Sequence, residues 1–321
     1  MNHLEASFTG KNSLWRYVVM VVSVFIVANT LGSLPLILAV TMKSVSDPGI
    51  LEEMASRPTD LTLLGIDPLV AFAMMVFPFL TALLAYYLLI KPLNYRTFSL
   101  TLNGTNSIRW KKIFISALVW LILISVYLLV FLKIDPDNYS VNNTTSSLIT
   151  LVVLSVVLIP FQAAFEEVVF RGYLMQGFTV LAGNRWLPVI LTSVLFGLMH
   201  SFNPEVDDFG FWDMIPQYVL FGLIFGIITV LDDGIEAAIG AHAMNNIFLS
   251  VMVTHKSSVL QTPALYEQHN YLPWTEFAGL LIMGIIFILI MRRLYRWKDL
   301  SIIFRKVYPA PSEISVPSSL L

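Results

Sequence analysis

Residues 148–171 read LITLVVLSVVLIPFQAAFEEVVFR. The run from Leu148 to Phe165 has no charged side chain and is long enough to form a membrane helix. Glu166, Glu167 and Arg171 follow it within two helical turns. Charges beside or inside a membrane helix are unfavourable and usually mark a functional site. The stretch therefore predicts a membrane protein with polar chemistry at or within the bilayer.

The composition of the whole chain predicts the same class of protein. Of 321 residues, 57% are hydrophobic and 12% are charged, and the mean hydropathy is +0.76. These values are too apolar for an average soluble domain, so we expect an integral membrane protein. The net charge of −2 provides no basic surface for nucleic acid. The absence of cysteine excludes disulfides, thiolate metal sites and cysteine nucleophiles.

Apolar runs along the chain predict an all-α fold, a polytopic membrane helical bundle of about eight transmembrane helices. The candidate spans are residues 15–41, 68–90, 110–133, 147–165, 186–202, 214–231, 234–254 and 275–294. The fifth is the weakest, because it is short and ends in the polar sequence Ser201-Phe202-Asn203-Pro204. We expect one transmembrane domain over residues 1–308, followed by a disordered Pro/Ser-rich tail at 309–321.

The distribution of lysine and arginine predicts the orientation of these spans. The loop at 91–112 contains five basic residues and no acid, and the chain after residue 291 is also basic. In contrast, the loops at 42–67 and 203–213 are mainly acidic. Because basic loops tend to remain in the cytoplasm, we expect both termini to be cytoplasmic.

Helical spacing separates the roles of the two adjacent glutamates. In a helix, Glu167 and Arg171 are four residues apart and can form an ion pair. Glu166 then points about 100° away and lacks that partner. Apolar surroundings disfavour its anionic form, which makes Glu166 a usable general base near neutral pH. The alternative is that all three charges lie at the headgroup level and only end the span.

Two further polar motifs lie in apolar runs downstream. In Phe196-Gly-Leu-Met-His200, an imidazole can share with a carboxylate the task of deprotonating a water, while Phe196 forms an apolar wall. A single histidine is more often a packing residue. His242 and Asn246 lie on one helix face and can hold a carbonyl oxygen that becomes negative. Alternatively, His242 and Asn246 only form hydrogen bonds to neighbouring helices. By position alone, Asn245 could hold the carbonyl oxygen equally well.

These motifs, in this order, resemble the three signature motifs of the CAAX protease and bacteriocin-processing family. That family comprises intramembrane endopeptidases and includes the Ras-converting prenyl-protein protease. The string Glu166-Glu167-Val-Val-Phe-Arg171-Gly-Tyr-Leu174 is similar to its first motif over the whole length. The resemblance covers a motif-bearing core at about residues 145–255. It implies an intramembrane endopeptidase, and a multi-pass protein of the bacterial cytoplasmic membrane.

The resemblance also implies a division of labour among the motif residues. Glu166 with His200 would activate the attacking water, and His242 with Asn246 would form the oxyanion hole. The Glu167–Arg171 pair would support the first motif. The resemblance also implies two partners for the protein. One is a peptide or lipidated protein substrate in the membrane, and the other is the lipid bilayer itself.

Three alternatives remain open on the residues themselves. We expect no cofactor, because there is no His-Glu-x-x-His motif, but Glu166, His200 and His242 would be a legitimate zinc-binding set if they converge. The protein can also be a catalytically silent scaffold or a bacteriocin-immunity protein of the same fold. A small-molecule or ion transporter is the third alternative, although the two halves of the chain do not resemble each other.

The predicted spans do not bring the motifs to one depth. Counted from the span ends, Glu166 falls near the cytoplasmic edge, whereas His200 falls near the opposite end of the fifth span and His242 lies between them. A kink at Pro160, or a fifth span that begins deeper, is needed to reconcile the three positions.

Overall fold

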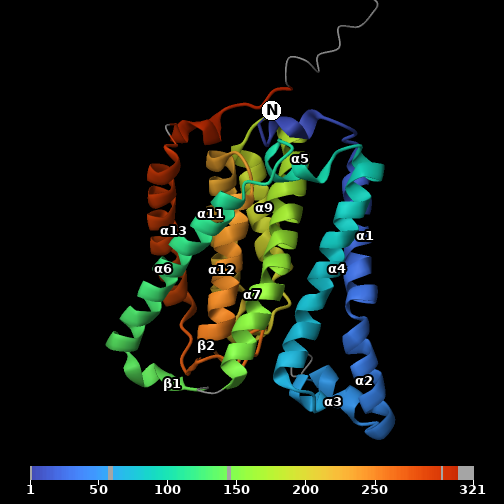
Figure 1. The fold of residues 1–321 in the computed structure, drawn as a ribbon, viewed down its shortest axis with the longest axis vertical. Coiled ribbons are helices and arrows are strands. Elements are labelled where there is room, and N and C mark those ends of the chain that lie inside the picture. The colour runs from blue at the N-terminus through green and yellow to red at the C-terminus, as the bar shows by residue number, and fades with distance from the viewer. Residues whose placement is uncertain (1, 57–60, 143–145, 298, 310–321) are drawn as a thin grey trace, which may run out of the picture.

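The structure is a computed structural model that describes residues 2–56, 61–142, 146–297 and 299–309 (Figure 1). It is all-α, as predicted, apart from three very short strands. Its longer helices are α1 Leu14–Val27, α2 Leu34–Ser46, α4 Pro68–Asn94, α6 Trp110–Ile134, α7 Ser146–Glu167, α9 Trp186–Met199, α11 Phe211–Asp232, α12 Glu236–Met252 and α13 Pro273–Tyr295. The shorter ones are α3 Ile50–Ser56, α5 Phe98–Asn103, α8 Met175–Ala182 and α10 Pro204–Phe209. Of the tail predicted at 309–321, residues 310–321 lie outside the described part.

Six helical segments within the described residues are long and apolar enough to cross a membrane, so the protein is an integral membrane protein. They are Leu14–Gly32, Pro68–Asn94, Trp110–Ile134, Ser147–Ala182, Phe211–Asp232 and Pro273–Tyr295. The predicted count of eight is therefore not met. The fifth run forms only α9, whose 14 residues span about 21 Å. The seventh forms α12, which has 17 residues, several of them polar.

The first predicted span, 15–41, is interrupted rather than continuous. Helix α1 leads into a π-helical segment at Ala28–Gly32, and α2 then begins at Leu34. Close packing fixes this break, because a Cβ at Gly32 would stand 2.6 Å from the Pro78 Cα of α4. Figure 1 shows α1 and α4 side by side, with α2 and α3 at the end of the bundle away from both termini.

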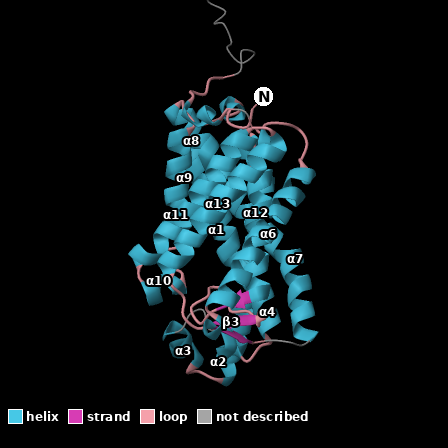
Figure 2. Ribbon diagram, turned by 90° about the vertical axis from the view of Figure 1, so that its left-hand side faces the viewer, coloured by secondary structure: helices cyan, strands magenta, loops and turns pink. Residues whose placement is uncertain are grey.

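The first and last described segments of the chain lie at the same end of the bundle (Figures 1 and 2). Near the N-terminus, the His3 backbone N–H donates to Asp233, in the turn between α11 and α12, at 2.8 Å. Near the C-terminus, the Val307 N–H donates to the Gly183 carbonyl oxygen, in the turn between α8 and α9, at 3.0 Å. Arg109, from the basic loop, binds Glu236 at the same end. These segments are grouped as predicted, and their location in the cytoplasm stays a prediction.

Helix α6 shows how the bundle meets its apolar surroundings. Leu118, Ile122 and Leu129 on one face are exposed, although all three are large and hydrophobic. Trp120, Ile124 and Leu128 on the opposite face are buried against α12 and α13. An apolar outer face is stable where the solvent is hydrocarbon, so α6 has the surface of a lipid-facing helix.

Small residues let α12 sit close to α6, as the run Ala237-Ala238-x-Gly240-Ala241 predicts. A Cβ at Gly240 would stand 2.1 Å from the Ile113 carbonyl oxygen, which leaves no room for any side chain. On its other side α12 packs against α7. Helix α12 is thus held between two long helices, and its polar residues lie inside the bundle.

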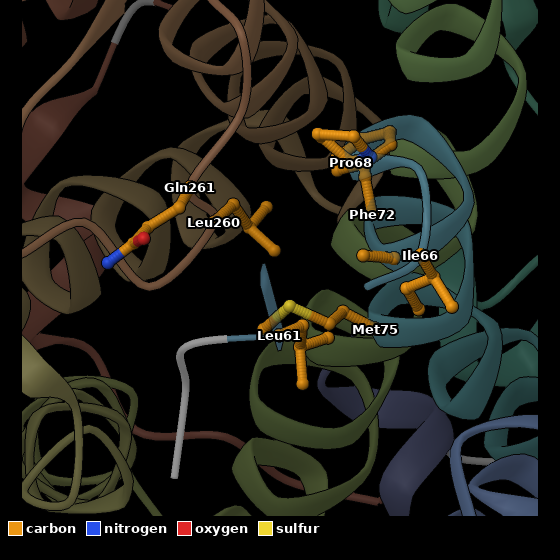
Figure 3. A pocket seen from close by; sticks show the side chains of 8 residues that line it. Leu61, Ile66, Pro68, Phe72, Met75, Leu260 and Gln261 are labelled. Atoms are coloured by element: carbon orange, nitrogen blue, oxygen red, sulfur yellow. The ribbon is translucent and has the colours of Figure 1, made fainter. Parts of the chain in front are cut away.

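The end of the bundle away from the termini is closed by short elements. Strands β1 Tyr139–Val141, β3 Tyr266–Gln268 and β2 Val253–Thr254 pair in that order, antiparallel and then parallel. At this end there is also a small cavity of about 30 Å³, lined by Leu260 and, near the start of α4, by Ile66 and Phe72 (Figure 3). Met75 and Leu260 also line the much larger cavity described below, so they separate the two.

Candidate active site

An antiparallel hairpin brings Glu166 and His200 to the same depth. The helix that begins as α7 does not end at the charges: it continues through the π-helical segment Val168–Leu174 into α8 and stops at Ala182. Gly183, with a φ of 62°, makes the left-handed turn into α9. Glu166 and His200 each lie 17 residues from Gly183 along the chain. The predicted difference in depth was wrong, because it assumed that the fourth span ends at residue 165.

The Glu167–Arg171 ion pair forms as the helical spacing predicts. The Arg171 Nη1 donates to Glu167 Oε1 at 3.0 Å, and both side chains are 0% exposed. The guanidinium also lies 4.3 Å from the centroid of the Phe196 ring, in cation–π geometry. Because the charges are paired within one helix and covered by aromatic rings, they do not end the span. They lie inside the bundle, within the long apolar segment Ser147–Ala182.

His242 from α12 lies between the two glutamates. Its Nδ1 is 2.7 Å from Glu167 Oε1, and a carboxylate can only accept, so the imidazole N–H donates there. Its Nε2 faces Glu166 Oε2 at 3.5 Å. This Glu166 oxygen is buried and has no hydrogen-bond partner among the described residues. One carboxylate therefore orients the imidazole, and the other has an oxygen available for a ligand.

Asn246 reaches the same glutamate through a side chain that the sequence analysis did not single out. Its Nδ2 donates to Gln162 Oε1 at 2.9 Å, and Gln162 Nε2 donates to Glu166 Oε1 at 2.5 Å. Asn245 plays a different part: its Oδ1 accepts from the indole N–H of the fully buried Trp120 at 3.2 Å. Of the two asparagines, Asn246 is the one linked to Glu166 through Gln162.

His200 approaches the same site from the end of α9. Its Nδ1 donates to the Phe196 carbonyl oxygen at 2.7 Å, which leaves Nε2 as the available nitrogen. The ring stacks on Tyr218 of α11, with centroids 4.2 Å apart and planes at 17°. In the described part of the chain, no hydrogen bond or ion pair joins His200 to Glu166 directly. Both residues line one cavity.

That cavity has a volume of about 1070 Å³. Glu166, His200, His242 and Asn246 all line it, together with apolar side chains from α1, α4, α8 and α11. Pockets that bind ligands have this character, with a few convergent polar groups in mainly apolar walls. The structure therefore places the four predicted catalytic residues around one space large enough for a chain segment.

Comparison with known proteins agrees with this constellation. Residues 145–248 match the family model described as Rce1-like, type II CAAX prenyl endopeptidase. The chain contains an Rce1-like domain. All seven motif residues discussed above lie within the matched segment.

A similarity also extends beyond the Rce1-like domain. The protein named "Uncharacterized protein YyaK" of Bacillus subtilis (strain 168) is 28% identical over 289 residues, which cover 89% of this chain and 94% of YyaK. This likeness includes helices on both sides of the matched segment. No solved structure matches the chain significantly.

The zinc alternative considered for this domain needs Glu166, His200 and His242 to converge on one point. Among the described residues, no group of three or more His, Cys, Asp or Glu side chains is arranged to hold a metal ion. His242 already uses Nδ1 on Glu167, and within the described residues no hydrogen bond or ion pair joins His200 to Glu166 or His242.

Sequence reasoning missed three polar contributors to the site: Gln162, Tyr218 and Trp120. Gln162 was detectable, because it precedes Glu166 by four residues and therefore shares its helix face. Tyr218 and Trp120 come from α11 and α6, and nothing in their local sequence links them to His200 or Asn245. Their roles depend on helix packing that a single sequence does not reveal.

Proposed function

We propose that the Rce1-like domain is an intramembrane endopeptidase that hydrolyses a peptide bond of a membrane-anchored or lipidated peptide or protein. One observation carries the proposal: the buried Glu166 Oε2 has no hydrogen-bond partner among the described residues and lies 3.5 Å from His242 Nε2, on the wall of an apolar cavity. A carboxylate oxygen with these surroundings is suited to accept a proton from water.

Glu166 and His200 act together on the attacking water. Gln162 holds Glu166 Oε1 and leaves Oε2 for the water. The Phe196 carbonyl oxygen fixes the His200 proton on Nδ1, so its Nε2 can accept from the same water. Stacking on Tyr218 limits rotation of the His200 ring. A water held between two acceptors in this way has its lone pair directed toward a carbonyl carbon.

His242 and Asn246 hold the oxygen that becomes negative. Because the His242 Nδ1–H donates to Glu167, holding an oxyanion through Nε2 requires a hydrogen on both ring nitrogens. The Nε2–H of protonated His242 and the Nδ2–H of Asn246 are then both donors at the cavity wall. Donors of this kind typically stabilise a tetrahedral intermediate by about 3–4 kcal/mol each.

The reaction then balances without a covalent enzyme intermediate. The water oxygen forms a bond to the carbonyl carbon while a water proton passes to Glu166. When the tetrahedral intermediate collapses, the C–N bond breaks and the proton moves from Glu166 to the leaving amine. The products are a carboxylic acid and an amine, and Glu166 is again a carboxylate.

The surroundings of the site support a membrane substrate. Apolar side chains from α1 and α8, including Val18, Phe25 and Leu181, line the cavity and are themselves exposed on the apolar surface of the bundle. A hydrocarbon chain can therefore contact the same walls as the peptide. The similarity to a Bacillus subtilis protein supports a bacterial cytoplasmic membrane as the location.

The test is peptide cleavage by the purified protein in lipid vesicles, followed by mass spectrometry of a mixture of membrane-anchored peptides. We expect Glu166→Gln to lower kcat/KM by about 10³-fold or more, and His200→Ala by about 10²-fold. The matched controls are Glu52→Gln and His269→Ala, which change exposed residues and should retain wild-type rates. Full activity in Glu166→Gln would end the general-base role. Absence of cleavage by the folded wild type would instead favour a silent scaffold.

A further inference from the structure

A second glutamate lines the same cavity, away from the proposed catalytic centre. Glu205 belongs to α10 and is 8% exposed. Its Oε1 accepts from the Val259 backbone N–H at 3.0 Å, whereas its Oε2 is buried with no hydrogen-bond partner among the described residues. A buried polar atom without a partner calls for a physical explanation, such as a ligand that supplies the missing partner.

The charges of the cavity wall indicate which ligand would fit. Its acidic lining residues are Glu166, Glu205 and Glu276, and none of the described lining residues is lysine or arginine. Glu276 already accepts from the Tyr127 hydroxyl at 2.9 Å and Glu166 from Gln162. Among the described residues that line the cavity, Glu205 is therefore the carboxylate outside the catalytic centre that has an oxygen without a hydrogen-bond partner.

The loop that carries Glu205 adds to this negative potential. Asp207 and Asp208 are exposed neighbours in α10, and Asp213 follows in the first turn of α11. Burial raises the pKa of Glu205, and the nearby Asp208 charge raises it further. An ammonium or guanidinium group placed at Oε2 would reverse this effect, because a nearby positive charge favours the carboxylate.

A continuous wall joins Glu205 to the catalytic centre. His200 stacks on Tyr218, whose hydroxyl oxygen accepts from Asn203 Nδ2 at 3.1 Å, and Asn203 precedes α10. Glu205 follows His200 by five residues, so their backbones are separated by at most about 18 Å. An extended peptide of about five residues can span that distance.

We propose that Glu205 is a subsite for a lysine or arginine side chain of the substrate, within about five residues of the scissile bond. The inference rests on the proposed endopeptidase function and adds a charge preference to it. The cation binds at Glu205 Oε2 while the peptide bond lies beside Glu166. The alternative is that Glu205 only tethers the backbone at Val259.

Binding is measured first, because it does not depend on catalysis. Short synthetic peptides, each with one lysine at a varied position, are compared with otherwise identical norleucine peptides on the folded Glu166→Gln protein in detergent. We expect the best lysine peptide to bind about tenfold more tightly than its norleucine counterpart, and this ratio to fall to about one when Glu205→Gln is added. The glutamine side chain in that variant keeps an acceptor for the Val259 N–H, so the tether survives. Asp207→Asn is the matched control, because it removes an exposed charge from the same helix and should keep the ratio.

Two results would overturn the subsite. One is an equal affinity for lysine and norleucine peptides at every position, or the absence of binding to either. The other is a lysine preference that persists in the Glu205→Gln protein. The activity assay distinguishes this failure from failure of the proposed function: cleavage that requires Glu166 but is indifferent to Glu205 rejects the subsite alone. Lysine-selective binding without cleavage rejects the endopeptidase and retains the cation site.

Discussion

Two ionic clusters meet on α12, and each combines two acidic with two basic side chains. The site cluster is Glu166, Glu167, Arg171 and His242. The tether cluster is Arg109, Lys112, Asp232 and Glu236. Glu236 begins α12, and His242 follows it by six residues on the same helix. The site cluster and the tether cluster differ in their surroundings.

The tether cluster holds the end of the bundle together. Arg109 Nη2 donates to Glu236 Oε2 at 2.5 Å, and Lys112 Nζ donates to Asp232 Oδ1 at 2.7 Å. These bonds join the start of α6 to the end of α11 and the start of α12. None of the four is among the described residues that line the large cavity, whereas Glu166 and His242 of the site cluster line it. Ion pairing is thus common to both clusters, and access to the cavity distinguishes the site cluster.

The variant with the largest expected effect, Glu236→Gln, should lose stability and keep its activity. We expect Glu236→Gln to lower the free energy of unfolding by about 3 kcal/mol, because it leaves the partly buried Arg109 without its closest counter-charge. The kcat of the protein that remains folded should be unchanged. Denaturant unfolding in detergent measures the first effect, and peptide cleavage per folded molecule measures the second. Exposed Glu52→Gln is the control. A fully stable but inactive Glu236→Gln protein would show that the two clusters act as one unit.

Asn246 should have the next largest effect, and on activity alone. If its amide holds the oxyanion, Asn246→Ala lowers kcat by about 10²-fold with little change in KM. The adjacent Asn245 donates to Asn246 Oδ1 at 3.0 Å, but its additional bond to Trp120 predicts a loss of stability in Asn245→Ala. Steady-state kinetics and thermal unfolding of both variants provide the measurement. An unchanged kcat in Asn246→Ala would leave His242 without its proposed partner.

Gly240 lies between the two clusters on α12, so a side chain there should disturb both. An added Cβ would stand 2.1 Å from the Ile113 carbonyl oxygen of α6, and α12 must shift to relieve the contact. We expect Gly240→Ala to reduce stability by about 1–3 kcal/mol and also to lower kcat, since His242 moves with the helix. Gly49→Ala is the control, because its nearest neighbour is 3.7 Å from the added carbon. A wild-type kcat in a destabilised Gly240→Ala protein would mean that the site tolerates movement of α12.

Within the site cluster, the sequence was sufficient to predict the Glu167–Arg171 pair, because that signal is local. Glu167 and Arg171 are one helical turn apart, as are His242 and Asn246, so simple helical geometry predicts which side chains share a face. The all-α class and the close packing of α12 were also predictable, from apolar runs and small residues. The tether cluster was not predicted, because Arg109 and Glu236 are far apart in sequence and each looks unremarkable in its own segment.

The span boundaries were the part of the fold that the sequence did not determine. Charges normally end a membrane helix, and this rule placed the end of the fourth span at residue 165. Pairing of Glu167 with Arg171 and the aromatic cover from Phe196 allow the helix to continue to Ala182. The apparent conflict in depth between Glu166 and His200 followed from that single boundary. A buried ion pair within one helix therefore needs to be considered before charges are used to end a span.

The smallest effect should come from removing metal ions, and it bears on what holds the site cluster together. Its side chains contact one another directly, with Glu167 on both Arg171 and His242, so ion pairs alone can maintain the geometry. A catalytic zinc site would instead need three ligands directed at one ion. We expect dialysis against a chelator to change the rate of peptide cleavage by no more than about twofold, with elemental analysis of the dialysed protein as the check that metal has been removed. A large loss that zinc restores would show that Glu166, His200 and His242 converge in the working enzyme. In that case the site cluster would differ from the tether cluster in its chemistry as well as in its access to the cavity.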